Sequence, residues 1–169
     1  YRKPFWRYSF YKARKYALSK TGNFNSNIGI IGCGSIGSLL IKYLKNHDLC
    51  IFAYDPYISK QKKNELNIKF VDLNWMFENC DIISNHLPDT VNTKGIIDYD
   101  LLSRMKENAT FINTGRGSQV VEKDLVSVLS SKKNICALLD VTVNEPIRPF
   151  SKLNTMENIF LSPHIAGSL

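Results

Sequence analysis

The stretch GIIGCGSIG, residues 29–37, decides the fold of this 169-residue chain. It holds three glycines in the spacing Gly32-x-Gly34-x-x-Gly37, directly after the apolar run Ile28–Ile31 and at the start of a helical pattern. In such a turn the first glycine allows a tight bend, the second lets a pyrophosphate approach the backbone, and the third lets the helix lie close to the strand. The N–H groups at the helix start attract the anion. On its own, the stretch would also fit a short apolar strand that contains glycines.

An acid after the next predicted strand favours the phosphate-binding interpretation. The stretch FAYDP places Asp55 at the end of the strand Cys50–Tyr54, eighteen residues after Gly37. A carboxylate at this place accepts hydrogen bonds from the ribose hydroxyls of a bound dinucleotide. Alone, Asp55 would be a turn residue before Pro56. Strand, glycines, helix, strand and acid in this order predict a dinucleotide site.

The same carboxylate predicts that the cofactor is NAD and not NADP. A 2′-phosphate on the ribose would bring a second negative charge close to Asp55. The residues that follow, Pro56 and Tyr57, include no Arg that would bind a phosphate. A flexible lysine of the next helix could swing in toward a phosphate, but we expect these side chains to be solvated: Lys60, Lys62 and Lys63.

Strands and helices alternate along the rest of the chain. We expect helices over Ser35–Lys45, Lys60–Leu66, Asp72–Glu78 (with Asp72 as N-cap), Asp100–Met105 and Glu122–Ser131. We expect further strands over Ile68–Val71, Asp81–Asn85, Ala109–Asn113, Ile135–Leu139 and Asn158–Leu161, and a loop over HLPDTVNTKG. Apolar strands that alternate with helices form parallel sheets covered on both sides. The predicted fold class is α/β, a Rossmann-type doubly wound parallel sheet.

The net charge of +7 comes from one segment. Residues 1–20 hold seven Lys or Arg and no acid, and the rest of the chain holds fifteen charges of each sign. Trp6, Phe10, Ala13 and Ala17 share one face of a helix, so we expect an aromatic face that packs on protein and not a nucleic-acid site. We divide the chain into an interdomain or dimerisation helix with its connector (1–24) and an NAD-binding domain (25–169).

Other compositional features predict a cytoplasmic protein without a metal or a membrane span. No apolar run approaches the roughly 18 residues that a span needs, and no secretory leader precedes the first helix. The four cysteines have no CxxC spacing, and we expect all of them to be buried free thiols: Cys33, Cys50, Cys80 and Cys136.

Four polar residues follow predicted strands in the second half of the chain. They lie in the stretches INTGRGSQVV, LLDVTVNEP and LSPHIAGS, and they are Arg116, Asp140, Glu145 and His164. The carboxyl ends of parallel strands meet at one edge, where ligands bind in open α/β sheets, so we expect the four to converge on one crevice.

Their chemistry suits the reduction of a carbonyl group. His164 can donate a proton near neutral pH, because histidine titrates close to that range. A carboxylate beside it holds the ring and favours its charged form. The planar, permanently charged fork of Arg116 suits a substrate carboxylate.

From about residue 20 onward, the sequence resembles the cofactor-binding domain of the D-isomer-specific 2-hydroxyacid dehydrogenases. The stretches that carry the resemblance, in order, are GIIGCGSIG, AYDPY, DIISNHLPDT, LLSRMKENATFINTGRGSQVVEKDL, ALLDVTVNEP and SPHIAGS. The resemblance implies an NAD-dependent oxidoreductase that interconverts a 2-keto acid and a D-2-hydroxy acid. It also implies a homodimer.

The resemblance further implies a role for each matching residue. Arg116 would orient the substrate, His164 would be the general acid–base, and Glu145 would be its partner. The implied cofactor-binding set is Gly32, Gly34, Ser35, Ile36, Gly37, Asp55, Leu87, Pro88, Thr93, Thr114, Gly115, Asp140 and Gly167. His86 lies next to this groove, and we interpret it as structural.

Two features differ from the family pattern. The family has a substrate-binding domain formed by chain on both sides of the cofactor domain, and we expect that domain to lie outside these 169 residues. Many relatives have an aromatic residue at the position of Thr142. Because Glu145 is retained, we interpret this as a subgroup difference.

Two alternatives and the choice of substrate stay open at this point. The carboxyl-terminal-binding transcriptional corepressors resemble the same family and keep the same three residues, so a dinucleotide-sensing interaction protein fits the motifs as well. An RNA-binding role for residues 1–20 is the third candidate. Lactate-, glycerate-, phosphoglycerate- and longer-chain-type acids all fit the sequence.

Overall fold

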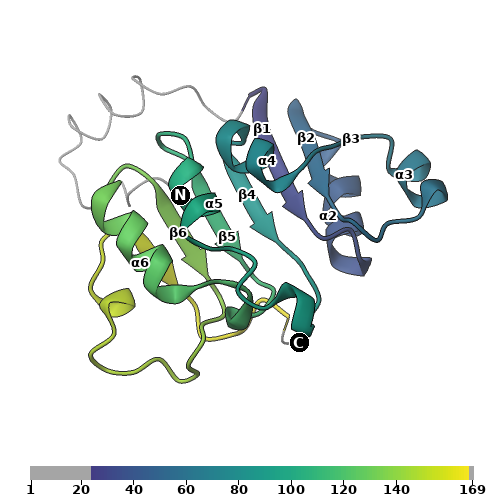
Figure 1. The fold of residues 1–169 in the computed structure, drawn as a ribbon. Helices are drawn as coiled ribbons and strands as arrows, with labels where there is room; N and C mark the ends of the chain where they lie inside the picture. The colour runs from purple at the N-terminus through teal and green to yellow at the C-terminus, as the bar shows by residue number, and fades with distance from the viewer. Residues whose placement is uncertain (1–23, 168–169) are drawn as a thin grey trace.

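The structure, a computed structural model, describes residues 24–167 (Figure 1). Most of the segment 1–24, including the aromatic-faced helix expected over residues 1–20, lies outside the described residues. The described part contains seven parallel strands in the order β3-β2-β1-β4-β5-β6-β7. Their bounds are β1 Ser26–Ile31, β2 Leu49–Tyr54, β3 Lys69–Phe70, β4 Ile82–Asn85, β5 Thr110–Asn113, β6 Cys136–Leu139 and β7 Ile159–Leu161. This order confirms the predicted Rossmann-type sheet.

Within residues 24–167, five α-helices connect the strands (Figure 1). Their bounds are α2 Ser35–Leu44, α3 Lys60–Leu66, α4 Leu73–Asn79, α5 Tyr99–Arg104 and α6 Glu122–Ser131. Three of them begin at side-chain caps: Ser59 accepts from Lys62 N, Asp72 from Trp75 N, and Asp98 from Leu101 N. The N-cap predicted at Asp72 is therefore confirmed.

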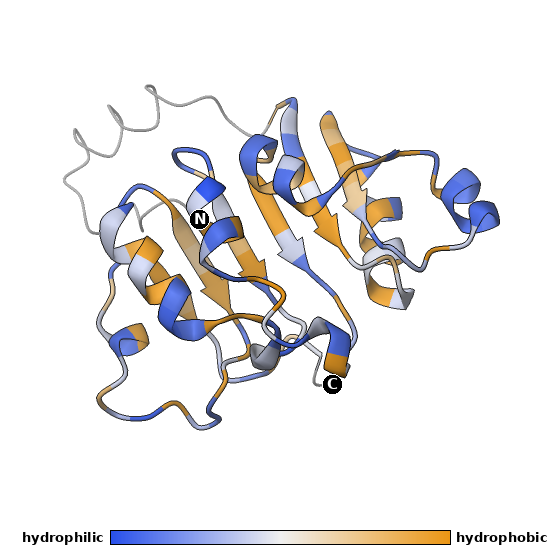
Figure 2. Ribbon diagram, in the orientation of Figure 1, coloured by the Kyte–Doolittle hydropathy of each residue, from blue (hydrophilic) through white to orange (hydrophobic). Residues whose placement is uncertain are grey.

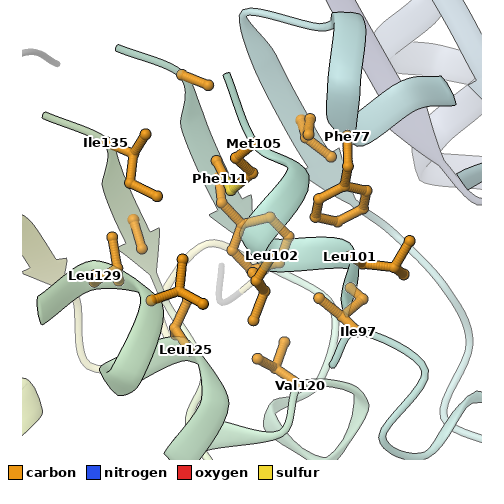
Figure 3. Packing of buried hydrophobic residues seen from close by; sticks show 14 of the residues in the cluster. Phe77, Ile97, Leu101, Leu102, Met105, Phe111, Val120, Leu125, Leu129 and Ile135 are labelled. Atoms are coloured by element: carbon orange, nitrogen blue, oxygen red, sulfur yellow. The ribbon is translucent and has the colours of Figure 1, made fainter. Parts of the chain in front are cut away.

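Helices cover the sheet from two sides, and Figure 2 shows that the strands are mostly apolar and that several of the helices over them carry both apolar and polar stretches. On one side, α4, α5 and α6 pack on the central and later strands; Figure 3 shows Leu102, Leu125 and Phe111 meeting there. On the other side, α2 and α3 pack over β1 and β2, where Ile30 and Ile41 are fully buried. The two faces of β1 thus enter different clusters, as a parallel strand buried on both sides requires.

The structure corrects the sequence analysis at one strand, one loop and one cysteine. Strand β3 has two residues instead of the four predicted over Ile68–Val71. The predicted loop HLPDTVNTKG contains a short 3₁₀ helix, η2 Val91–Thr93, and two more follow later, η3 Gly117–Gln119 and η4 Lys152–Asn154. Cys33, Cys80 and Cys136 are buried and in no disulfide, as predicted, but Cys50 is exposed, because it lies near the amino end of β2 at a position turned to solvent.

Among residues 24–167, no helix is long and apolar enough to cross a membrane. Within the same residues, no group of three or more His, Cys, Asp or Glu side chains could hold a metal ion.

Candidate functional site

The strand register brings four of the predicted site residues into one row: Gly32, Asp55, Thr114 and Asp140. The last paired residues of six strands are Ile31, Tyr54, Asn85, Asn113, Leu139 and Leu161. The residues that follow them at the carboxyl edge are Gly32, Asp55, His86, Thr114, Asp140 and Ser162. The chain reverses its direction of travel across the sheet between β1 and β4. This is where an open α/β sheet forms a ligand crevice.

The glycine turn has the geometry that its spacing predicts. Gly32 has a left-handed backbone with φ of 89°, and a Cβ there would lie 2.7 Å from the carbonyl oxygen of His86. A Cβ on Gly37 would lie 2.0 Å from the carbonyl oxygen of Gly32, so only glycine fits between β1 and α2. A Cβ on Gly34 would meet nothing within 4 Å, because this residue borders open space.

Asp55 holds this turn in place. Its Oδ2 atom accepts a hydrogen bond from the backbone N–H of Cys33 at 2.8 Å, and its Oδ1 atom accepts one from the N–H of Tyr57 at 3.0 Å. Each carboxylate oxygen has a second lone pair, so both can still accept from a ligand. The acid predicted at the end of β2 thus ties the glycine turn to the loop after that strand.

A cleft with a volume of about 930 Å³ opens at this point of the sheet. Of the predicted cofactor residues, eight line it: Gly32, Gly34, Ser35, Ile36, Asp55, Leu87, Pro88 and Thr93. The N-terminus of α2 borders it, and among the described residues no side chain caps this end. An uncapped helix N-terminus binds anions, so the residues present fit the pyrophosphate of a dinucleotide.

Lys62 is a correction to the sequence analysis. It was expected to be solvated, but its half-buried side chain lines the same cleft as Asp55. Lys60 is exposed, and the ammonium group of Lys63 lies over the ring of Phe70 at 5.0 Å from its centroid. One positive charge therefore faces the part of the cleft in which the acid lies.

His86 is positioned by hydroxyl groups on both sides of its ring. Its Nε2 atom lies 2.8 Å from Ser84 Oγ, and its Nδ1 atom lies 3.5 Å from Thr114 Oγ1. Burial lowers the pKa of His86, which keeps the ring neutral. These contacts support the structural interpretation of this histidine.

Asp140 organises the segment that contains His164. Its backbone carbonyl accepts from His164 N at 3.0 Å. Its carboxylate accepts from Ser162 Oγ at 2.5 Å, Ile165 N at 3.0 Å and Ala166 N at 2.9 Å. Burial alone would raise the pKa of Asp140, but these hydrogen bonds and the nearby His164 outweigh it and hold the pKa below its usual range. Asp140 thus holds residues 162–166 in place.

His164 and Glu145 form a close pair. The Nδ1 atom of His164 lies 2.7 Å from Glu145 Oε2, and both side chains are partly exposed. Glu145 Oε1 accepts from the backbone N–H of Thr142 at 3.1 Å. The hydrogen bonds from His164 and Thr142 lower the pKa of Glu145, so it stays a carboxylate at neutral pH. His164 has a left-handed backbone with φ of 54°, and such strain is typical of functional sites.

The backbone that follows Arg116 packs against Thr142, the residue that donates to Glu145. A Cβ on Gly117 would lie 2.0 Å from the carbonyl carbon of Thr142, so the segment after Arg116 lies directly against the residue that holds Glu145. The exposed guanidinium donates from NH1 to the carbonyl of Gly115 at 2.8 Å. Of the four residues expected to converge, the structure links Asp140, Glu145 and His164 by hydrogen bonds and connects Arg116 through this backbone contact.

The remaining predicted residues lie outside the lining of the cleft. Gly37 lies beneath the turn, and Thr114 and Gly115 follow β5. Gly167 is exposed beside the His164 segment, and a Cβ there would meet nothing within 4 Å.

Sequence analysis missed several residues that line the cleft. They are Cys33, Tyr54, Pro56, Tyr57, Ile58, Ser59, Lys62, Thr90, Asn92 and Ile96; His86, which was placed beside the groove, also lines it. Those after Asp55 could have been found, since the segment that follows the acid has to pass the ribose. Asn92 in η2 carries no such signal, because a short 3₁₀ turn has no apolar period of its own.

Comparison with known proteins gives a consistent result. The family described as D-isomer specific 2-hydroxyacid dehydrogenase, NAD binding domain, matches residues 4–166. A D-3-phosphoglycerate dehydrogenase of Synechocystis sp. is 33% identical over 145 residues, which make up 86% of this chain and 26% of that protein. A hydroxypyruvate reductase of Blautia hydrogenotrophica is 36% identical over 140 residues, 83% of this chain and 43% of that protein.

The fold is also similar to solved structures. The D-isomer specific 2-hydroxyacid dehydrogenase from Lactobacillus delbrueckii ssp. bulgaricus, in its NAD complexed form, aligns with a TM-score of 0.74 and 25% identity. The alignment covers 86% of this chain and 48% of that one. The chain thus spans less than half the length of each of these three proteins.

Proposed function

The chain belongs to the D-isomer specific 2-hydroxyacid dehydrogenase family through its NAD-binding domain, and from this we propose that the whole protein interconverts a 2-keto acid and a D-2-hydroxy acid. One observation carries the proposal furthest. The Glu145–His164 pair lies at the same sheet edge as the cleft that fits a dinucleotide. A proton donor and a cofactor cleft at one edge are what a carbonyl reduction requires.

Each residue has a distinct task in this proposal. NAD(H), when bound, supplies or accepts the hydride. Arg116 binds the carboxylate of the substrate and orients its carbonyl group. His164 donates a proton to the carbonyl oxygen in reduction and removes a proton from the hydroxyl group in oxidation. Glu145 holds the imidazole ring and stabilises the positive charge of the protonated ring.

The cofactor tasks divide between the two ends of the cleft. Asp55 accepts from the adenosine ribose, and the turn from Gly34 to Ile36 binds the pyrophosphate. Leu87, Pro88 and Thr93 line the groove. At the nicotinamide end we place Thr114, Gly115 and Gly167, and we assign Asp140 to the same end, where it also fixes the His164 segment.

Two features of the whole protein complete the proposal. We propose that residues 1–24 form an interdomain and dimerisation segment of a homodimer and that residues 25–169 form the NAD-binding domain. The aromatic face in the sequence of residues 1–20 supports this, since such a face needs a protein surface to cover it. None of the four cysteines forms a disulfide in the described residues, which supports a reducing compartment, the cytoplasm.

The experiment compares this chain with the full-length protein. The full-length protein is given NADH and a panel of 2-keto acids, and NADH oxidation and the configuration of the product are measured. We expect a D-2-hydroxy acid from at least one substrate. The 169-residue chain alone should bind NADH but turn over little substrate, because closure by a second domain excludes water from the reaction. Failure of the full-length protein to reduce any member of the panel would contradict the proposal.

A further inference from the structure

Three amide side chains form a buried network between the cofactor groove and Arg116. Asn85 at the end of β4, Asn113 at the end of β5 and Gln119 in η3 are 0%, 1% and 0% exposed. Asn85 Nδ2 donates to Asn113 Oδ1 at 2.9 Å and to Gln119 Oε1 at 2.6 Å. Buried polar groups of this kind are costly unless each is satisfied, so their presence calls for a role.

Gln119 links the two functional segments through its two ends. Its Nε2 atom donates to the carbonyls of Leu87 and Pro88, both at 2.9 Å. Its Oε1 atom accepts from the backbone N–H of Arg116 at 3.1 Å. A single side chain therefore holds two backbone carbonyls of the cofactor groove and the amide of the arginine proposed to bind substrate.

Asn113 and Asn85 complete the arrangement. Asn113 Nδ2 donates to the carbonyl of Arg116 at 3.1 Å, and Asn113 Oδ1 also accepts from Gly115 N at 3.1 Å. Asn85 Oδ1 accepts from Leu87 N at 3.3 Å. Both backbone polar groups of Arg116 and both of Leu87 are thus bonded to the amide network.

Only one orientation of these amides satisfies the network. If the Gln119 amide were reversed, its NH₂ group would face the donors Arg116 N and Asn85 Nδ2, and its oxygen would face two carbonyl oxygens. The network is also closely packed against the backbone. A Cβ on Gly115 would lie 2.7 Å from Gln119 Oε1 and 3.0 Å from Asn85 Nδ2.

We propose that Asn85, Asn113 and Gln119 are positioning residues that fix Arg116 relative to the cofactor groove. This rests on the proposed function, in which Arg116 binds the substrate carboxylate. Leu87 and Pro88 line the cofactor groove, and the same side chain that holds their carbonyls also holds the Arg116 amide. The groove and the arginine then act as one rigid unit, so that substrate and cofactor keep a fixed relative placement.

The test is Gln119→Met, which keeps the length of the side chain and removes all four of its hydrogen bonds. In the full-length enzyme we expect kcat/KM for the 2-keto acid to fall about 10- to 100-fold, mainly through KM, since small misplacements of a substrate-orienting group have effects of this size. In the 169-residue chain we expect the backbone amide of Arg116 to exchange with solvent about tenfold faster relative to the amides of β4, because its acceptor is gone.

Leu129→Ala is the matched control. Leu129 is 1% exposed in the core and lies outside the network, so this variant is destabilised without loss of the Arg116 contacts. It should accelerate the exchange of core amides and keep the KM of the wild type. The exchange rate of the Arg116 amide relative to those of the β4 amides should stay unchanged. Asn85→Leu provides a second test if Gln119→Met does not fold, and it should raise the same KM.

Two results would overturn the proposal. One is a KM for the 2-keto acid in Gln119→Met and in Asn85→Leu that equals the wild-type value. The other is an Arg116 amide whose exchange changes only in proportion to global stability. If the unsubstituted full-length protein reduces no 2-keto acid, the proposed function fails, and the exchange ratio still decides whether the network holds Arg116.

Discussion

The Nδ1 atom of His164 lies 2.7 Å from the Oε2 atom of Glu145, although the two residues are nineteen positions apart. The left-handed backbone of His164 is held by its N–H bond to the carbonyl of Asp140. Glu145 is held in turn by the N–H of Thr142. Both members of the pair are therefore held in place by neighbouring backbone groups.

Glu145→Gln should slow the reaction and leave cofactor binding unchanged. The amide has the size of the carboxylate but no charge to face the positive ring, and kcat should fall about 100-fold or more. Steady-state kinetics of the full-length enzyme give kcat, and NADH fluorescence gives the dissociation constant. An unchanged kcat would remove Glu145 from the mechanism.

Arg116→Lys should behave as a severe substitution. A lysine ammonium is a point charge and cannot make two parallel hydrogen bonds to a carboxylate. We expect kcat/KM for the 2-keto acid to fall about 100-fold because the substrate is no longer aligned. The test uses the full-length enzyme at saturating NADH, and Arg104→Lys, in the exposed pair with Glu78, is the matched control. Equal values for wild type and Arg116→Lys would contradict the assignment.

Asp140→Asn should destabilise the domain in a pH-dependent way. The pKa of Asp140 is lowered in the folded protein, so its contribution to stability is present above its unfolded pKa near 4 and is lost as the pH falls through the folded pKa. At pH 7 the substitution places an NH₂ group or a weaker acceptor against Ile165 N and Ala166 N, and it should cost about 1–3 kcal/mol.

Urea unfolding of the 169-residue chain at several pH values checks this prediction. The difference between wild type and Asp140→Asn should shrink below about pH 4. A difference that stays constant with pH would show that the Asp140 charge does not hold the His164 segment.

Lys62 should affect the choice between NADH and NADPH. A 2′-phosphate about 4 Å from the Asp55 carboxylate costs on the order of 4 kcal/mol at an effective dielectric near 20, and half of that is a factor of roughly 30 in affinity. Lys62 lines the same cleft and offsets part of this repulsion. In fluorescence titrations, Lys62→Ala should therefore lower the affinity for NADPH more than the affinity for NADH. Lys60→Ala, at an exposed position, should change neither affinity. Equal losses for the two nucleotides would contradict this role.

Much of the fold could be predicted because each segment carries its own signal. Helices α3 and α6 begin and end where the sequence predicts, since Ser59 and the apolar spacing of Leu125, Val128 and Leu129 define them locally. The glycine turn was predictable for a similar reason: Gly32 and Gly37 satisfy steric demands that only glycine meets.

Other features depend on contacts that no local pattern records. Gln119 and Asn85 are thirty-four positions apart and meet only because β4 and β5 are neighbours. The hydrogen-bond partners of the Asp140 carboxylate could not be predicted either, because they are backbone N–H groups of the segment after β7. Cys50 lies in an apolar strand, and its exposure follows from its position near the amino end of β2.

The account depends most on the claim that a dinucleotide binds at the glycine turn, and Gly34→Ala tests this most directly. Gly34 has an ordinary backbone conformation with φ of –63°, and a Cβ there meets no protein atom within 4 Å, so the variant should fold as well as the wild type. Its methyl group would occupy the space that the pyrophosphate needs. Gly37→Ala is the contrasting variant, because its Cβ would lie 2.0 Å from the Gly32 carbonyl oxygen and should destabilise the fold itself.

The decisive measurement is the dissociation constant of NADH for wild type and Gly34→Ala in the 169-residue chain, together with their urea midpoints. The account predicts the same midpoint for both proteins and an NADH dissociation constant about tenfold or more higher in Gly34→Ala, a loss of at least about 1.4 kcal/mol. Equal NADH affinity at equal stability would show that the cofactor does not bind at this turn.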